Sequence, residues 1–349
     1  MKKVNKTVII LMFSLTFLGG CWDNKDIEKR VLPLVIGIAK GGNNGYQVTV
    51  QIPLTKTSGL MSRIVTSKGP SVSRALGEIQ TNSENAVDYS QVHLVVIQKN
   101  LANNSKQLRQ LIKFLMRSKE IPTNAQLAFT DDPIVNLLSN INDKLGVDAT
   151  SLFDYFNKGA GWAPGISNTR IWEVYRSLYS YTDDITIPIV GSGKDTVLIY
   201  KGAAAFKKGK ITQRINPDET QLINLFQTNN ANGKIENVGF ASVMVKNSAV
   251  KNIAFMKDNE PTVSTNLKLK IDVLEVHAGI TNDQINNKLE KLLEKRFYHV
   301  LKQSKKTNTD LFGFGKYFRH QIPYDDLKNW REKYYPNLKA NFQVQVSSE

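Results

Sequence analysis

The chain contains a single cysteine, Cys21, which stands directly after a short apolar segment close to the N-terminus. Lysines precede that segment, which covers residues 8–18. About eleven residues cannot cross the hydrocarbon layer of a bilayer, which needs about twenty. A basic start, a short apolar run and small residues together are the layout of a secretory signal. The sequence therefore predicts a signal peptide over residues 1–20 and a mature fold that cannot contain an internal disulfide.

The segment Leu18-Gly19-Gly20-Cys21 resembles the bacterial lipobox. In a lipobox the thiol takes a diacylglycerol, the signal is cut before it, and the new N-terminus is usually acylated. A thiolate suits this role because it is a good nucleophile. We therefore expect cleavage between Gly20 and Cys21 and lipidation of Cys21, with an uncleaved anchor and an incidental cysteine as the alternative. A lipidated Cys21 leaves no thiol for metal sites or nucleophilic catalysis.

The formal net charge is +15, and residues 1–20 hold three lysines and no acids, so the mature chain carries +12. Nucleic acid is a common partner of such a charge. A lipid-anchored protein lies outside the cytoplasm, so we expect no nucleic acid partner. An anionic lipid surface or wall polymer is the expected counterpart, with an attraction that salt screens. A basic surface that only contacts solvent is the alternative.

Residues 21–349 are more than one ordinary domain needs. Composition changes over residues 182–195, which hold an acidic pair, a proline and a Gly-Ser-Gly turn signal. We therefore expect two domains, 21–190 and 191–349. The second can subdivide near residue 260, which gives three. Hydrophobic residues make up 41% of the chain, enough for packed cores, and no later apolar run approaches the length of a membrane span.

Periodicity predicts a mixed first half. A hairpin is expected from residues 31–39 and 46–54, a polar loop over 56–69, and buried strands over 92–97 and 126–130. Helices are expected after Ser71, from about Ser105 and after Pro133, and over 150–157 and 171–178, with a glycine-rich loop over 159–165.

Strands dominate the expectations for the second half. They cover residues 196–206, 211 onward, 238–245, 250–256, 267–275 and 339–346, with a short helix over 219–226. A long helix starts at Thr281, where Gln284 completes a capping box. Its apolar stripe is expected to pack on a sheet, with lysines in solvent, and lying on a membrane is the alternative. The fold class is α+β, with mainly antiparallel sheets, packed helices and this long C-terminal amphipathic helix against a sheet.

Residues with catalytic chemistry do not form a recognisable site. The histidines are His93, His277, His299 and His320, without ligand-like spacing, and the acids occur as adjacent pairs at 131–132, 183–184 and 325–326. Acids at such positions cap helices, and neighbours in a strand face opposite ways. Gly-x-Ser-x-Gly, phosphate-loop and dinucleotide motifs are absent from the sequence. We expect a non-enzyme without catalytic residues, metal site or cofactor.

Taken in order, several segments resemble the Ger(x)C family of spore germination lipoproteins. They are Cys21-Trp22-Asp23 with Asp26-Ile27, Gly37-Ile38, Gly69 with the helix after it, the 92–97 strand running into Leu101-Ala102, Phe206-Lys207-Lys208-Gly209-Lys210, the lysine-rich helix, Asp310-Leu311-Phe312-Gly313-Phe314-Gly315, Trp330 and Pro336. The resemblance covers essentially the whole chain. It departs at Ala39-Lys40, where family members often carry an acid.

The resemblance implies a GerAC-like C subunit of a nutrient germinant receptor. Such a subunit lies on the outer face of the inner spore membrane, held by its lipid, beside two multi-pass subunits called A and B. The B subunit, which looks like an amino-acid transporter, is favoured as the ligand binder, and whether the C subunit binds a small molecule stays open. We expect an accessory or coupling subunit needed for the germination response. An extracytoplasmic solute-binding lipoprotein is the alternative, and a wall-modifying enzyme is the weakest hypothesis.

Overall fold

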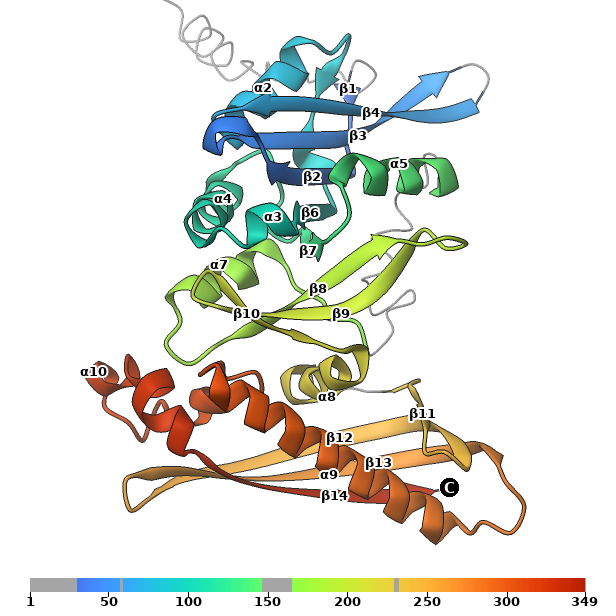
Figure 1. Cartoon of the computed structure of the whole chain (residues 1–349), viewed down its shortest axis with the longest axis vertical. Helices are drawn as coiled ribbons and strands as arrows, with labels where there is room; N and C mark the ends of the chain where they lie inside the picture. Colours follow the sequence, from blue (N-terminus) through green and yellow to red (C-terminus); the bar gives the residue numbers. More distant parts are fainter. Residues whose placement is uncertain (1–29, 57–58, 146–164, 229–231, 349) are drawn as a thin grey trace, which may run out of the picture.

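The computed structural model describes residues 30–56, 59–145, 165–228 and 232–348. They form an eight-stranded sheet, a four-stranded sheet and a small two-stranded one. The two larger sheets follow one another along the long axis, with α8 (Pro217–Thr228) between them (Figure 1). Gly20, Cys21, the expected 150–157 helix and almost all of the 159–165 loop lie outside the described residues. Within the described ranges, no helix is both long and apolar enough to cross a bilayer.

The eight-stranded sheet is parallel in its centre and antiparallel at both sides. Its order is β10-β9-β8-β7-β6-β2-β3-β4, and β2, β6, β7 and β8 pair in parallel. The strands are β2 (Val35–Lys40), β3 (Tyr46–Lys56), β4 (Gly59–Gly69), β6 (Leu94–Gln98), β7 (Gln126–Thr130), β8 (Ile185–Ser192), β9 (Leu198–Lys207) and β10 (Lys210–Ile215). The small sheet joins β1 (Arg30–Val31) to β5 (Ala86–Val87).

Helices cover both faces of this sheet, which explains why its central strands are apolar throughout. On β2, Ile36 and Ile38 face a core shared with three helices, whereas Val35 and Ala39 face a second core. The first core contains α2 (Val72–Thr81), α4 (Ser105–Arg117) and α7 (Ile171–Tyr179), and the second contains α5 (Ile134–Leu145). Short helical pieces occur at η3 (Gly42–Asn44), η4 (Tyr89–Gln91) and α3 (Lys99–Ala102).

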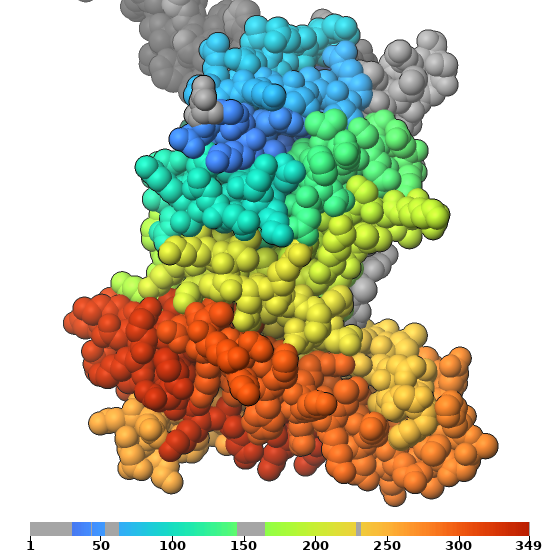
Figure 2. Space-filling model, viewed as in Figure 1, coloured from blue at the N-terminus to red at the C-terminus, as the bar shows by residue number. Residues whose placement is uncertain are grey.

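The C-terminal sheet has the order β11-β12-β13-β14, and its last strand pairs in parallel with β13. It consists of β11 (Ile235–Asn237), β12 (Ala241–Lys257), β13 (Glu260–Val276) and β14 (Lys339–Ser348). Between β13 and β14 lie α9 (Asn282–Lys306), η5 (Phe314–Phe318), α10 (Tyr324–Leu327), η6 (Trp330–Tyr334) and η7 (Tyr335–Asn337). Figure 2 shows these orange and red residues as one body against the yellow strands.

Helix α9 confirms the long amphipathic helix predicted to pack on a sheet. Thr281 caps its start by accepting a hydrogen bond from the Gln284 N–H, and the Gln284 side chain accepts the N–H of Thr281 at 2.9 Å. Its buried residues include Leu289, Leu293 and Phe297, which share a core with β12, β13 and β14. The apolar stripe is therefore covered by the protein's own sheet, so the alternative that it lies on a membrane is wrong.

Two local expectations are wrong. Residues 59–69, expected within a polar loop, are strand β4, which pairs with β3 along its whole length. Serine and threonine suggested a loop, yet threonine and valine also suit a half-buried sheet surface. The strands expected over 238–245 and 250–256 are one strand, β12, whose pairing with β13 continues across an irregularity between Val245 and Asn247.

The eight-stranded sheet continues across the predicted domain division at residue 190, because β9 and β10 belong to it. The division at 190/191 stays a prediction about domain organisation. Near residue 260 the chain does not pass into a separate sheet, since β12 and β13 form one hairpin there. The mixed α+β class with antiparallel pairs and packed helices is confirmed.

Two glycines are expected to respond oppositely to alanine. Gly202, in β9, has a φ of +93°, and a Cβ there would lie 2.2 Å from the carbonyl oxygen of Ile215. Gly77, in α2, would place a Cβ in open space. We expect Gly202→Ala to lower the free energy of unfolding by about 2 kcal/mol or more, and Gly77→Ala to raise it by about 1 kcal/mol. Urea unfolding followed by circular dichroism checks this, and equal effects at both positions would contradict it.

Candidate functional site

A buried ion pair joins the two large sheets. Asp184 lies in the loop between α7 and β8, and Arg331 lies in η6, beyond α9. The Arg331 Nη2 donates to Asp184 Oδ1 at 2.7 Å, and Nε lies 3.1 and 3.0 Å from the two carboxylate oxygens. Arg331 Nη1 also donates to the carbonyl of Ser180 at 3.0 Å. Both charged residues are 1% exposed, so this pair forms a charge-assisted contact out of reach of water.

A second acid, Asp310, is hydrogen-bonded to the first. Its backbone N–H donates to Asp184 Oδ2 at 2.8 Å, while its own carboxylate accepts from the N–H groups of Phe314 and Gly315 at 3.0 and 2.6 Å. The indole N–H of Trp330 donates to the same carboxylate at 3.1 Å. We call Asp184, Asp310, Trp330 and Arg331 the buried cluster. The segment from Asp310 to Gly315 is thus a turn folded around its own acid.

Gly315 is required where this turn meets Trp330. A Cβ on Gly315 would lie 2.6 Å from the indole nitrogen and 2.7 Å from the Cβ of Thr182. On the other side of the turn, Phe312 stacks on Phe297 of α9, with ring centroids 4.8 Å apart. The turn therefore contacts the α7–β8 loop through its glycine and the C-terminal core through its phenylalanine.

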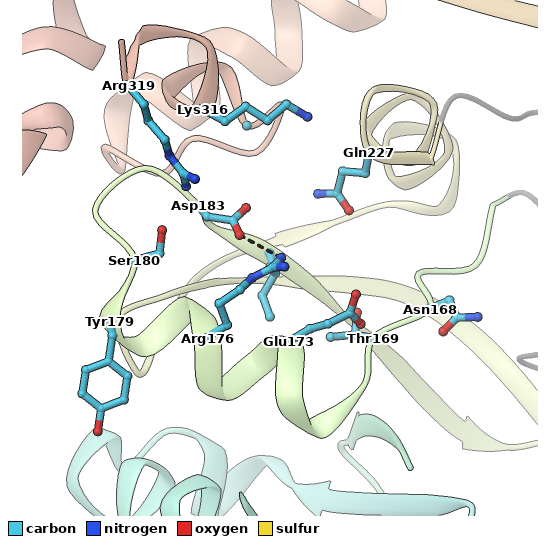
Figure 3. Close-up of a pocket in the computed structure, with 12 residues that line it drawn as sticks. Asn168, Thr169, Glu173, Arg176, Tyr179, Ser180, Asp183, Gln227, Lys316 and Arg319 are labelled. Carbon is cyan, nitrogen blue, oxygen red and sulfur yellow. Dashed lines mark ion pairs between the residues drawn. The ribbon is translucent and has the colours of Figure 1, made fainter. Parts of the chain in front are cut away.

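A charged cleft of about 630 Å³ adjoins the buried cluster. One wall comes from α7 and the following loop and holds Glu173, Arg176 and Asp183, and the other holds Lys316 and Arg319 (Figure 3). We call this space the charged cleft.

Several side chains of the charged cleft are held by neighbours within it. Arg176 pairs with Asp183 at 2.9 Å, and Glu173 accepts the backbone N–H of Arg170 at 2.8 Å. Arg319 Nε donates to the hydroxyl of Thr182 at 2.9 Å, which links the two walls. Charges of both signs line a space open to solvent. The cleft can accept polar or charged groups, but its carboxylates are engaged in structural contacts rather than paired with each other for proton transfer.

The acids singled out in the sequence occupy separate places. Asp131 is bound by Lys99 and Arg214, and Asp132 by Lys201. The adjacent acids 183 and 184 point to different arginines, Arg176 and Arg331, as expected for neighbours. Among the histidines, His299 lies 3.4 Å from Glu219, and burial lowers the pKa of His93. In the part of the chain that the structure describes, no three metal-binding side chains gather.

The buried cluster was not predicted from the sequence. The hydrogen bond from Asp310 to Asp184 spans 126 residues, and the ion pair from Arg331 to Asp184 spans 147. Local periodicity in the sequence cannot indicate a contact between residues so far apart along the chain. The available signal was an acid leading directly into Leu-Phe-Gly-Phe-Gly, because an acid beside a buried apolar run needs hydrogen-bond donors.

The fold and the buried cluster define an α+β protein whose two large sheets share a buried acid–arginine pair. Comparison with known families matches residues 23–192 to the spore germination protein N-terminal domain and residues 201–348 to the spore germination B3/GerAC-like C-terminal domain. The chain therefore belongs to the GerAC, or Ger(x)C, family of spore germination proteins, which confirms the resemblance seen in the sequence.

Individual relatives agree with this assignment. Spore germination protein KC of Bacillus subtilis (strain 168) is 22% identical over 97% of this chain and 93% of its own length. Spore germination protein GerQC of Bacillus cereus is 22% identical, with 94% of each chain covered. The crystal structure of the GerBC protein matches with a TM-score of 0.59 at 16% identity, covering 90% of this chain and 96% of that one. The structural likeness shows a shared fold.

Removing the arginine of the buried cluster is expected to destabilise the protein strongly. Arg331→Met leaves the Asp184 carboxylate buried without its partner, which costs about 3–5 kcal/mol of the free energy of unfolding. The control is Arg74→Met, which breaks the exposed pair with Glu78 (the arginine side chain is 69% exposed) and costs less than about 1 kcal/mol. Urea unfolding measures both, and a loss at Arg331 no larger than that of the control would contradict the role given to the pair.

Asp310 is expected to make stability depend on pH near neutrality. Burial raises the pKa of Asp310 to about 7, against the opposing effect of the N–H donors, whereas an unfolded aspartate titrates near 3.9. Between about pH 4 and pH 7, the folded state therefore keeps a proton on Asp310 that the unfolded state has lost. Its contribution to stability is complete below about pH 4 and is lost as pH rises through about 7.

The measurement compares the parent with Asp310→Asn, which cannot titrate. The difference between their free energies of unfolding should change across pH 5–8, at most by about 1.4 kcal/mol per pH unit. The parent should lose stability relative to the variant as pH rises. Parallel profiles for the two proteins would contradict the titration of Asp310 in this window.

Proposed function

We propose that this chain is the C subunit of a spore nutrient germinant receptor. Its signal peptide is cleaved between Gly20 and Cys21, and a lipid on Cys21 anchors the mature chain. It acts by protein–protein contact at the membrane surface, as an accessory or coupling subunit needed for the germination response. The observation that carries the proposal is the match of both family domains, which together span residues 23–192 and 201–348. The family resemblance implies the partners, which are two multi-pass subunits called A and B. It also implies the location, which is the outer face of the inner spore membrane.

The organisation of the molecule suits coupling. The buried cluster ties the loop after α7 to the segment after α9, and β9 and β10 share a hydrophobic core with the C-terminal sheet, so the two sheets are joined by packed contacts. The charged cleft lies beside that contact and offers Lys316, Arg319 and Glu173 to a polar partner. The proposed role includes no catalysis, because the acids of this region serve as hydrogen-bond acceptors within the fold.

A solute-binding lipoprotein is the second candidate function. The observation that favours it is the charged cleft, whose volume of about 630 Å³ is large enough for a small polar molecule. Calorimetric titration of the mature chain with amino acids and sugars separates the candidates, because saturable micromolar binding supports the second.

Replacing the anchor residue tests the first candidate. We expect Cys21→Ala to reduce the membrane-bound fraction at least about tenfold, since lipid chains supply the hydrophobic free energy of anchoring, and to depress germination by the cognate nutrient. A C-terminal tag on the parent should recover two multi-pass proteins from dormant-spore membranes, and the variant should not. Normal germination by a stably produced variant would rule out a necessary anchor, and recovery of this chain alone would contradict a receptor subunit.

A further inference from the structure

Among the residues that the structure describes, the C-terminal sheet has one covered face and one uncovered face. Helix α9 packs on the first, against the buried residues Val263, Leu267 and Leu269 of β13. The alternate residues of the strands point the other way, and we call this surface the open face. Cross-strand pairing places these residues on it: Lys251, Ile253, Phe255 and Lys257 from β12, Thr262, Ser264, Asn266, Lys268 and Lys270 from β13, and Lys339, Asn341, Gln343, Gln345 and Ser347 from β14.

Side chains occupy the free edges of this sheet. The Gln321 amide accepts the N–H of Met256 at 3.0 Å and donates to the carbonyl of Ala254 at 3.0 Å, as a neighbouring strand would. At the opposite edge, the Glu290 carboxylate accepts the N–H of Val346 at 2.9 Å. These contacts oppose the addition of a strand from another chain. The open face itself is what the sheet offers to a partner.

The charge of the open face is positive. Two of its border acids are paired, Glu260 with Lys339 at 2.5 Å and Asp272 with Lys246 at 3.0 Å, and a third acid, Asp258, lies in the hairpin turn beside Lys257 and near Lys339. Lys251, Lys257 and Lys268 are exposed, and the structure, within the residues it describes, gives them no hydrogen bond or ion pair. Unpaired lysines on one face of a sheet attract an anionic surface.

Two further features are specific to this face. Near the irregularity of β12, a hollow of about 340 Å³ has Lys268, Lys270 and Ser347 in its mixed polar and apolar lining. Towards the end of the β12–β13 hairpin, Ile253 is 54% and Phe255 is 42% exposed.

We propose that the open face docks on a bilayer of anionic phospholipid. Ile253 and Phe255 enter the boundary between headgroups and acyl chains, while Lys251 and Lys257 on either side remain at the level of the phosphates. An acidic protein surface would satisfy the lysines but would not explain an aliphatic and an aromatic side chain held in solvent between them. The inference deepens the proposed function, because the lipid at Cys21 keeps the chain at a membrane.

The place of the four-stranded sheet in the molecule bears on how the tether and the open face would act together. The four-stranded sheet is at the opposite end of the long axis from β1, the first described strand (Figure 1). Docking at the sheet would give a chain anchored at Cys21 a second contact with the bilayer. Each lysine near an anionic surface strengthens binding about fivefold, and confinement by the tether raises the effective concentration of the face at the membrane.

The test uses the mature chain, residues 21–349, with Cys21→Ser so that no lipid contributes. It is mixed with vesicles of phosphatidylcholine containing phosphatidylglycerol, or of phosphatidylcholine alone, and sedimented. We expect binding to the anionic vesicles that weakens as salt rises. Lys251→Gln/Lys257→Gln/Lys268→Gln should weaken that binding about 100-fold, and Ile253→Ser/Phe255→Ser should weaken it as well.

The matched control carries the same loss of charge on the other side of the sheet. Lys291, Lys295 and Lys302 are exposed on α9, and their replacement by glutamine should leave vesicle binding within about threefold of the parent. Urea unfolding confirms that all variants are folded. Equal losses in the two triple variants, or no binding of the parent to anionic vesicles, would overturn the proposal. So would capture of an acidic receptor subunit through the open-face lysines without vesicle binding. Because Cys21 takes no part, failure here leaves the anchor and the receptor role unaffected.

Discussion

The ion pair between Asp184 and Arg331 is the buried charged contact between the two large sheets, and it lies beside a hydrophobic core that β9 and β10 share with α9 and the C-terminal sheet. Burying an arginine and a carboxylate is costly unless each finds further hydrogen bonds, and both do, from the loop after α7 and from the backbone of Asp310. The pair therefore specifies one geometry for the contact between the two sheets. A shift of either sheet would leave a charge in an apolar interior, which favours one position of the two sheets relative to each other.

Local sequence signals predict most of the secondary structure of this chain and few of its long-range contacts. Ser71 and Thr281 cap α2 and α9 through side-chain bonds three residues away, so sequence spacing alone located both helices. Composition predicts a polar loop where strand β4 lies, because pairing with β3 rather than composition decides the conformation of these residues. The buried cluster was missed for the same reason, since three distant segments supply it. The lipidation of Cys21 is inferred from the adjacent residues alone. It stays a prediction, because Cys21 lies outside the described residues.

The family motif from Asp310 to Gly315 takes on a physical meaning in the fold. Its acid accepts the N–H donors of its own turn, its glycine admits the ring of Trp330, and its phenylalanines enter the core with α8 and α9. Each position of the motif thus serves a separate contact. The motif thereby holds the loop after α7 to the C-terminal core.

The place of β14 in the sheet affects the order in which the chain can fold. This last strand supplies Phe342 and Val344 to the core beneath α9 and lies in parallel with β13, from which a whole helix and several turns separate it. Parallel pairing over such a separation forms late, because the loop must close before any contact stabilises it. The C-terminal core therefore cannot close until β14 has been synthesised. A shortened chain would leave β13 as an unpaired edge.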